Sequence, residues 1–258
     1  MNKIMVAVLL SIVGVGHTLL FASQTSEKGG KPRDNDTFFL VHGMTGGGWD
    51  WQIVDQLLSA RGAYVNRVTL TGLGERVHLA NPAIGLDTHI SDVENAIAFE
   101  NKDNVILVGH SYGGMVISGV MDRIPEHISH AIFLDAIVPK DGTSVADLRP
   151  DLLKNRVVDG MIYPESVRSG TGRPRDVPQS LKTLTDRVSF SHPKVTNIPS
   201  TLVIFSKNRK ARELRAVNDQ SWHTAEARGW TIRHLQSDHN AQRSHPEALV
   251  KLLFEIVE

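Results

Sequence analysis

Four short apolar runs without polar alternation recur along the chain, at 37–41, 104–108, 131–134 and 201–205. Such runs are typical of parallel strands that helices cover on both faces, because neither face of the strand then meets water. Two weaker apolar runs, in which polar residues partly alternate with apolar ones, lie at 64–70 and 230–235. The pattern therefore predicts a sheet that is mostly parallel.

Segments with helical periodicity lie between these runs, at 51–60, 89–99, 112–123, 212–227 and 246–257. Strands that alternate with helices form right-handed βαβ units, which build a doubly wound α/β sheet. Ligands of such sheets bind at the carboxyl ends of the strands. We therefore look for chemistry where each strand ends.

Residues 140–195 interrupt the alternation, because four prolines stand there among short polar and apolar pieces. This composition predicts a small cap inserted over the strand ends, within one α/β domain at 37–258. Residues 161–163 of the cap, together with Trp49 and Trp51, are candidates to line a pocket, although core packing is the more common role of such side chains.

The N-terminus has the order of a secretory signal: Lys3, an apolar stretch to Ala22, and then small and polar residues. We interpret 1–22 as a cleaved signal peptide and 23–36 as a polar spacer, which predicts a secreted or periplasmic protein that leaves the membrane after cleavage. An uncleaved anchor is the alternative, since the stretch is long enough to span a bilayer.

Charge and cysteine content exclude several classes of function. The 28 basic and 28 acidic residues balance, and no basic stripe indicates a nucleic-acid partner. With no cysteine, the chain has no disulfide, no thiol nucleophile and no thiolate metal site. His127 and His130 are three residues apart, but no carboxylate pattern accompanies them, so no metal site is predicted.

A candidate nucleophile follows the second strong apolar run, where Gly109-His110-Ser111-Tyr112-Gly113 joins a strand to a helix. The G-x-S-x-G spacing is typical of a sharp turn that lifts the serine hydroxyl above the sheet. The glycines remove side chains that would collide there, and His110 is expected to point away from Ser111. The alternative is an ordinary glycine-rich turn without catalytic function.

The loop after the first strong run, His42-Gly43-Met44 with three further glycines, supplies the second element. In this kind of fold an oxyanion hole takes one N–H from such a loop and one from the residue after the nucleophile. The backbone amides of Met44 and Tyr112 are the candidates. For the side chain of His42 we expect packing and ordering of the loop.

His239 is the candidate general base, because it follows the last strand and precedes the last helix. This position places it at a strand end, in the order serine, acid, histidine along the chain. His245 is a weaker competitor one helical turn later.

Several segments, including VHGMTGGGWDW, TGLGERVHL, VGHSYGGMVISGV and FLDAIVPKDG, resemble the α/β-hydrolase family of plant methyl esterases of the salicylate-binding type, hydroxynitrile lyases and bacterial relatives. The resemblance implies a Ser-His-acid site, small ester substrates and no cofactor. It also favours ester hydrolysis over cyanohydrin cleavage, because Gly43 and Asn240 stand where the lyases place characteristic polar or basic side chains.

The acid departs from the family pattern, since Asn208 stands where the usual carboxylate would follow the strand 201–205. Asp135 is the best substitute, because it ends the strand next to that of the nucleophile, and a charged aspartate there is costly unless it is paired. The other candidates are Asn208 itself, Asp238, Glu213 and Asp219.

The sequence therefore predicts a serine esterase in which Ser111 attacks, His239 transfers the proton and Asp135 orients the ring. The alternative is a small-molecule binding protein on a hydrolase scaffold with weak or vanished catalysis, for which Asn208 is the only support. A hydroxynitrile lyase comes third.

Overall fold

The computed structural model describes residues 36–153, 157–164, 172 and 174–258. The predicted signal peptide and nearly all of the predicted spacer lie outside the described residues, so both stay predictions. No helix in the described part of the chain is both long and apolar enough to cross a membrane.

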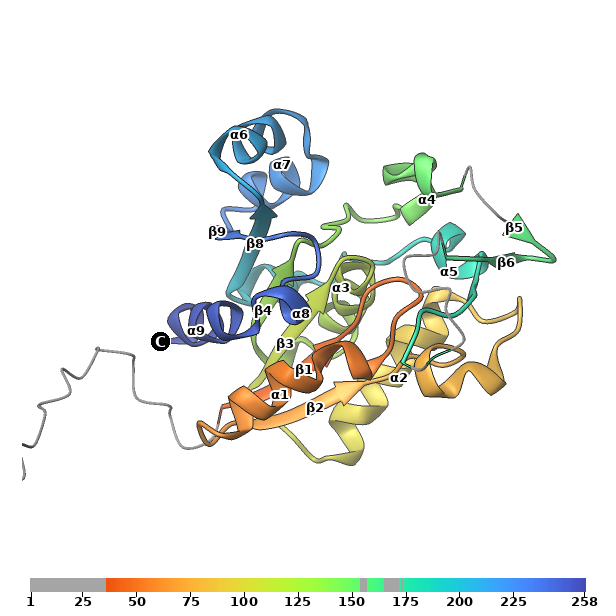
Figure 1. The fold of residues 1–258 in the computed structure, drawn as a ribbon, viewed down its shortest axis with the longest axis horizontal. Coiled ribbons are helices and arrows are strands. Elements are labelled where there is room, and N and C mark those ends of the chain that lie inside the picture. Colours follow the sequence, from red (N-terminus) through yellow and green to blue (C-terminus); the bar gives the residue numbers. More distant parts are fainter. Residues whose placement is uncertain (1–35, 154–156, 165–171, 173) are drawn as a thin grey trace, which may run out of the picture.

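Six parallel strands form the central sheet in the order β2-β1-β3-β4-β8-β9 (Figure 1). Their bounds are β1 Thr37–Val41, β2 Tyr64–Val68, β3 Val105–His110, β4 Ile128–Leu134, β8 Ser200–Ser206 and β9 Thr231–Gln236. Every residue of β1, β3 and β8 is buried, as their unbroken apolar runs predict. The predicted doubly wound parallel sheet is confirmed.

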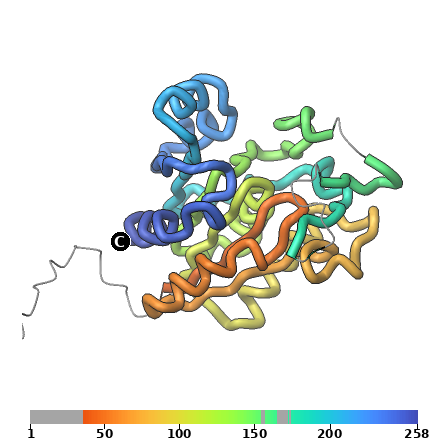
Figure 2. The backbone as a smooth tube through the Cα atoms, viewed as in Figure 1, coloured from red at the N-terminus to blue at the C-terminus, as the bar shows by residue number. Residues whose placement is uncertain are grey.

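Helices cover both faces of this sheet. On one face α2 (Leu86–Phe99) packs against α3 (Gly113–Arg123), and on the other α1 (Gln52–Ser59) packs against α9 (Pro246–Val257) (Figure 2). Successive strand residues point to opposite faces, so each strand contributes to both cores: Phe39 to the α2–α3 side and Phe38 to the α1–α9 side.

The predicted helix 212–227 is wrong in one respect, because the segment forms two helices, α6 (Arg209–Asn218) and α7 (Gln220–Ala227). Asp219 between them has extended backbone, with φ −89° and ψ 113°. Its side chain accepts a hydrogen bond from the Ser221 N–H at 2.9 Å. An aspartate that caps a helix N-terminus competes with continuation of the preceding helix.

The chain between β4 and β8 contains the predicted cap. Its regular elements are α4 (Val145–Leu148), η4 (Pro150–Leu153), β5 (Val157–Val158), β6 (Met161–Ile162), β7 (Gln179–Ser180), α5 (Lys182–Thr185) and η5 (Pro193–Asn197). The three short strands form a separate antiparallel sheet, β5-β6-β7. The remaining short helices are η1 (Gly48–Trp51), η2 (Gly74–Leu79), η3 (Pro125–His127) and α8 (Ala241–Ser244).

Candidate active site

The turn between β3 and α3 holds Ser111 in a strained backbone conformation, with φ +53°. Glycine is needed on both sides of it. A Cβ on Gly109 would lie 2.8 Å from the Gly113 carbonyl oxygen, and a Cβ on Gly113 would lie 2.8 Å from the Val41 carbonyl oxygen. A non-glycine residue in the left-handed region is uncommon and occurs preferentially at functional sites. The geometry is that of a nucleophile elbow.

The loop after β1 passes directly against this turn. A Cβ on Gly43 would lie 3.2 Å from the Cβ of Ser111, and Met44 lines the same cavity as Ser111 and Tyr112. The next residue is tied to the cap, because the Thr45 N–H donates to Gln179 Oε1 at 2.8 Å. The two predicted oxyanion-hole residues are thus brought beside Ser111.

The side chain of His42 holds this loop in place through two hydrogen bonds. Its Nδ1 lies 2.8 Å from the Gly43 carbonyl oxygen, and its Nε2 accepts the Leu70 N–H at 3.1 Å. This pair of partners assigns the proton to Nδ1. Burial lowers the pKa of His42 to about 4, so the ring is neutral at physiological pH. Packing and loop ordering are therefore its role in the structure.

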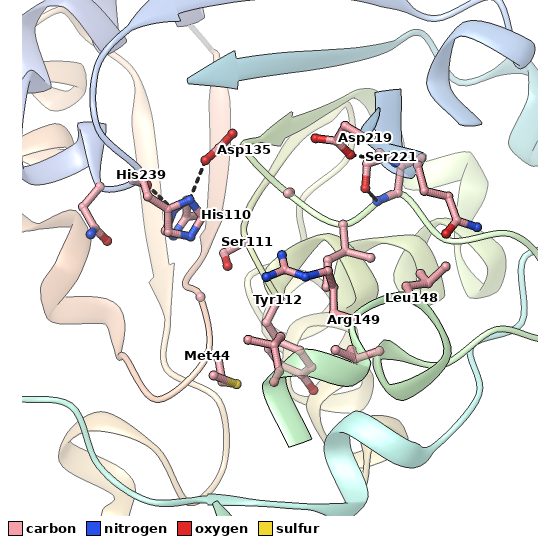
Figure 3. A pocket seen from close by; sticks show the side chains of 18 of the residues that line it. Met44, His110, Ser111, Tyr112, Asp135, Leu148, Arg149, Asp219, Ser221 and His239 are labelled. Carbon is pink, nitrogen blue, oxygen red and sulfur yellow. Dashed lines mark hydrogen bonds and ion pairs between the residues drawn. The ribbon is translucent and has the colours of Figure 1, made fainter. Parts of the chain in front are cut away.

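His239 contacts the predicted acid directly. Its Nδ1 lies 2.5 Å from Oδ2 of Asp135, although the two residues are 104 positions apart in the chain (Figure 3). The His239 side chain is 51% exposed and lines the cavity with Ser111. The competitor His245 is bonded instead to Ser237 Oγ, at 3.0 Å.

Asp135 is held rigidly at the carboxyl end of β4. Its N–H donates to the Val203 carbonyl oxygen at 2.8 Å, and its Oδ1 accepts the Phe205 N–H at 3.2 Å. Its φ is +45°, again in the left-handed region, and its side chain is only 7% exposed. The neighbouring strand β8 therefore positions this carboxylate through two backbone contacts.

Arg215 on α6 is a further residue of this site, which no sequence motif indicates. Its guanidinium forms ion pairs with Asp135 and with Asp219, and Nη1 also donates to the Phe205 carbonyl oxygen at 3.2 Å. Burial by itself raises the pKa of Asp135, but the hydrogen bond from His239 and the positive charge of Arg215 outweigh burial and hold that pKa below its ordinary value. The carboxylate therefore stays ionised at neutral pH.

His110 packs against His239. Its ring lies 4.6 Å from that of His239, centroid to centroid, and its Nε2 is 2.7 Å from the His239 carbonyl oxygen. Burial lowers the pKa of His110 to about 3, so the neutral ring donates from Nε2. His110 thus fixes the loop that carries His239. No local signal separates this histidine from any other residue at the variable position of G-x-S-x-G.

The other candidate acids are engaged elsewhere. Asn208 caps α6, since its Oδ1 accepts a helix N–H at 2.9 Å, and its side chain is exposed. Asp238 accepts the Asn240 N–H at 2.8 Å, and Glu213 pairs with an arginine of its own helix at 2.7 Å. Asp219 pairs with Arg215 and caps α7.

The cavity above Ser111 has a volume of about 950 Å³. The cap and the α6–α7 hairpin form much of its wall, and their apolar contributors are Val145, Leu148, Leu152, Leu184 and Leu214. Residues 161–163, Trp49 and Trp51 do not line it, and Trp51 is fully buried in the core. Among the described residues, no group of three or more histidine or carboxylate side chains could hold a metal ion.

The chain belongs to the alpha/beta hydrolase family, whose model matches residues 38–252. Over 120 residues it is 48% identical to a carbendazim hydrolyzing esterase of Nocardioides sp. (strain SG-4G), covering 46% of this chain and 50% of the relative. It is 35% identical over 114 residues to Methylesterase 8 of Arabidopsis thaliana, covering 40% and 38%. The match thus spans at most about half the length of these curated relatives.

Solved structures agree on the fold. An extracellular alpha/beta-hydrolase from a Paenibacillus species superposes with a TM-score of 0.67 at 20% sequence identity, covering 86% of this chain and 98% of that one. At this identity the likeness concerns the fold alone.

Proposed function

We propose that the protein is a serine esterase that hydrolyses small carboxylic esters through an acyl-enzyme. The observation that carries this proposal is the 2.5 Å contact between His239 Nδ1 and Asp135 Oδ2 in the cavity that holds Ser111. An imidazole oriented by a buried, ionised carboxylate beside a serine on a strained turn is the arrangement that acyl transfer requires.

In the first half of the reaction, Ser111 Oγ attacks the ester carbonyl carbon while its proton passes to Nε2 of His239. The amides of Met44 and Tyr112 donate to the oxyanion of the tetrahedral intermediate. The intermediate collapses, the C–O bond to the alcohol breaks, and His239 returns the proton to the leaving oxygen. Asp135 stabilises the imidazolium through Nδ1.

In the second half, water attacks the acyl-enzyme with His239 as base. The intermediate then releases the carboxylic acid and restores the Ser111 hydroxyl. Both halves use the same proton path, so one histidine serves each of them.

The relatives support an ester substrate, because those matched most strongly are named as esterases. Gly43 supports hydrolysis over cyanohydrin cleavage, since it leaves no side chain between the loop and Ser111. Export from the cytoplasm, through the predicted signal peptide at 1–22, is a further part of the proposal.

The test compares kcat/KM on p-nitrophenyl acetate and butyrate for the parent and for Ser111→Ala. We expect a fall of about 10³-fold or more in the variant, since the nucleophile is removed while binding remains. Mass spectrometry of acid-quenched parent should show the acyl adduct on Ser111. If the parent is no more active than Ser111→Ala, and both proteins bind small ligands with the same affinity, the protein is a binding protein instead.

A further inference from the structure

A second cavity of about 680 Å³ lies against α7. Its wall includes Phe190 and His192 before β8, the outer part of α7, and Trp230 ahead of β9. Gln220 is the one residue among those described that lines both cavities. The mechanism proposed above uses no side chain of this second cavity.

Arg228, just after the end of α7, dominates the chemistry of this cavity. Its guanidinium lies 4.0 Å from the ring centroid of Phe190 and 5.2 Å from that of Trp230. Nη2 donates to the Pro139 carbonyl oxygen at 2.7 Å. Nη1 is buried, and no acceptor for it exists in the part of the chain that the structure describes.

No carboxylate compensates this cation among the described residues. Burial is the sole influence on the pKa of Arg228, which it lowers to about 10, so the group is still charged at neutral pH. A half-buried cation without an anionic partner is costly, because burial removes part of its hydration. The rings and the negative end of α7 offset only part of that cost.

The other polar groups of the cavity add to its positive character. Lys140 lines it, and its one acidic residue, Asp141, already accepts the Phe190 N–H at 2.9 Å. His192 and His223 also line the wall, and neither side chain carries a negative charge. Val195 and Ala227 contribute apolar surface. An occupant that matches this wall has an apolar body and one negative charge.

We propose that this cavity binds a small carboxylate with an aromatic or aliphatic body, and that the carboxylate pairs with Arg228. Arg228 lines the cavity, and its positive charge attracts a carboxylate there. This binding is independent of the chemistry at Ser111. Ester hydrolysis would release ligands of the same class in the cavity that holds Ser111.

The experiment titrates benzoate and its neutral isostere benzamide into the full chain by isothermal calorimetry. We expect benzoate to bind at least about tenfold more tightly, since a hydrogen bond to a charged group contributes more than one between neutral groups. Arg228→Met should remove this preference. Arg149→Met is the matched control, because Arg149 lines the cavity of Ser111 and should leave benzoate affinity unchanged.

Two results would overturn the proposal. In the first, the parent binds benzoate and benzamide equally or binds neither. In the second, benzoate binding is lost in Arg149→Met but not in Arg228→Met. The parent comparison needs no variant, so it decides even if Arg228→Met fails to fold. Quenching of Trp230 fluorescence by benzoate, absent in Trp230→Phe, is expected in addition. Because no turnover is measured, failure here is distinct from failure of the proposed esterase activity.

Discussion

Strands β4 and β8 are neighbours in the sheet, yet the residues that follow them carry different chemistry. After β4 stands Asp135, a carboxylate with a 7% exposed side chain that contacts His239. After β8 stands Asn208, an exposed amide that caps the helix following it. Neighbouring strands are only about 4.8 Å apart, but β4 ends at the level of Val203 while β8 continues to Ser206, so Asn208 lies farther along the sheet than Asp135. Which strand brings a carboxylate to His239 therefore depends on where each strand ends.

The difference extends to the helix after β8. In place of a carboxylate from the loop before it, α6 contributes Arg215, which binds the carboxylate of the neighbouring strand. Asp135 is thereby contacted by His239 on one oxygen, and by Arg215 and the Phe205 N–H on the other. The end of β4 thus provides the carboxylate of Asp135, and β8 with the helix after it provides the N–H groups that bind this carboxylate.

The largest expected effect comes from removing the charge at the β4 end. Asp135→Asn should lower kcat/KM on p-nitrophenyl acetate by about 10³–10⁴-fold, because an amide neither stabilises the imidazolium nor enforces the correct tautomer. Steady-state kinetics with Ser111→Ala as the blank measure this loss. A variant within about tenfold of the parent would remove Asp135 from the mechanism.

A second change tests whether the β8 end can replace the β4 end. The double variant Asp135→Asn/Asn208→Asp should stay as inactive as Asp135→Asn, because the side chain at 208 is directed to the N-terminus of α6 rather than to His239. The same assay measures it. Recovery of about tenfold or more over Asp135→Asn would show that the two strand ends are interchangeable.

Arg215→Met should shift pH dependence rather than abolish activity. Without the guanidinium the pKa of Asp135 rises, and the loss of a nearby positive charge also favours protonation of the base that Asp135 contacts, so we expect the acidic limb of the kcat/KM profile to move to higher pH. Because the folded pKa of Asp135 lies below its ordinary value, its stabilisation is present above about pH 4 and is lost as the pH falls through the folded pKa. Acid unfolding, followed by circular dichroism, should therefore begin at higher pH in the variant.

Arg209→Met is the matched control for this experiment. Arg209 lies on the same helix, its side chain is 83% exposed, and within the described part of the chain its ion pair is with Glu213, at 2.7 Å. Its removal should leave both the activity profile and the acid transition in place. Equal shifts in the two variants would assign the effect to general loss of positive charge on α6.

The smallest expected effect is at the β8 end. Asn208→Ala should cost about 1 kcal/mol of stability through loss of the helix cap, which corresponds to a fall in Tm of about 2–4 °C. Differential scanning calorimetry measures the change, and Asn208→Ser, which retains a capping oxygen, should recover most of it. A fall in kcat/KM of about 10²-fold would contradict the assignment of Asn208 as a cap alone.

The fold and the elbow could be predicted because their signals are local. The apolar runs of β1, β3 and β8 report burial of both strand faces, and the glycines around Ser111 report contacts that a Cβ would make impossible. The break between α6 and α7 was not predicted, since Asp219 fits a helical pattern until its hydrogen bond with the Ser221 N–H is known. The role of His110 was hidden because its partner, the backbone of His239, is 129 positions away in the chain.

By itself the sequence determined the doubly wound sheet, the strained turn at Ser111 and the position of His239 at a strand end, because each depends on residues close together in the chain. It left several acids open. Only the tertiary structure brought Asp135 to His239 across 104 positions and Arg215 to Asp135 across 80. The choice among acids depends on which strand ends are neighbours and which way their side chains face, and sheet pairing decides both.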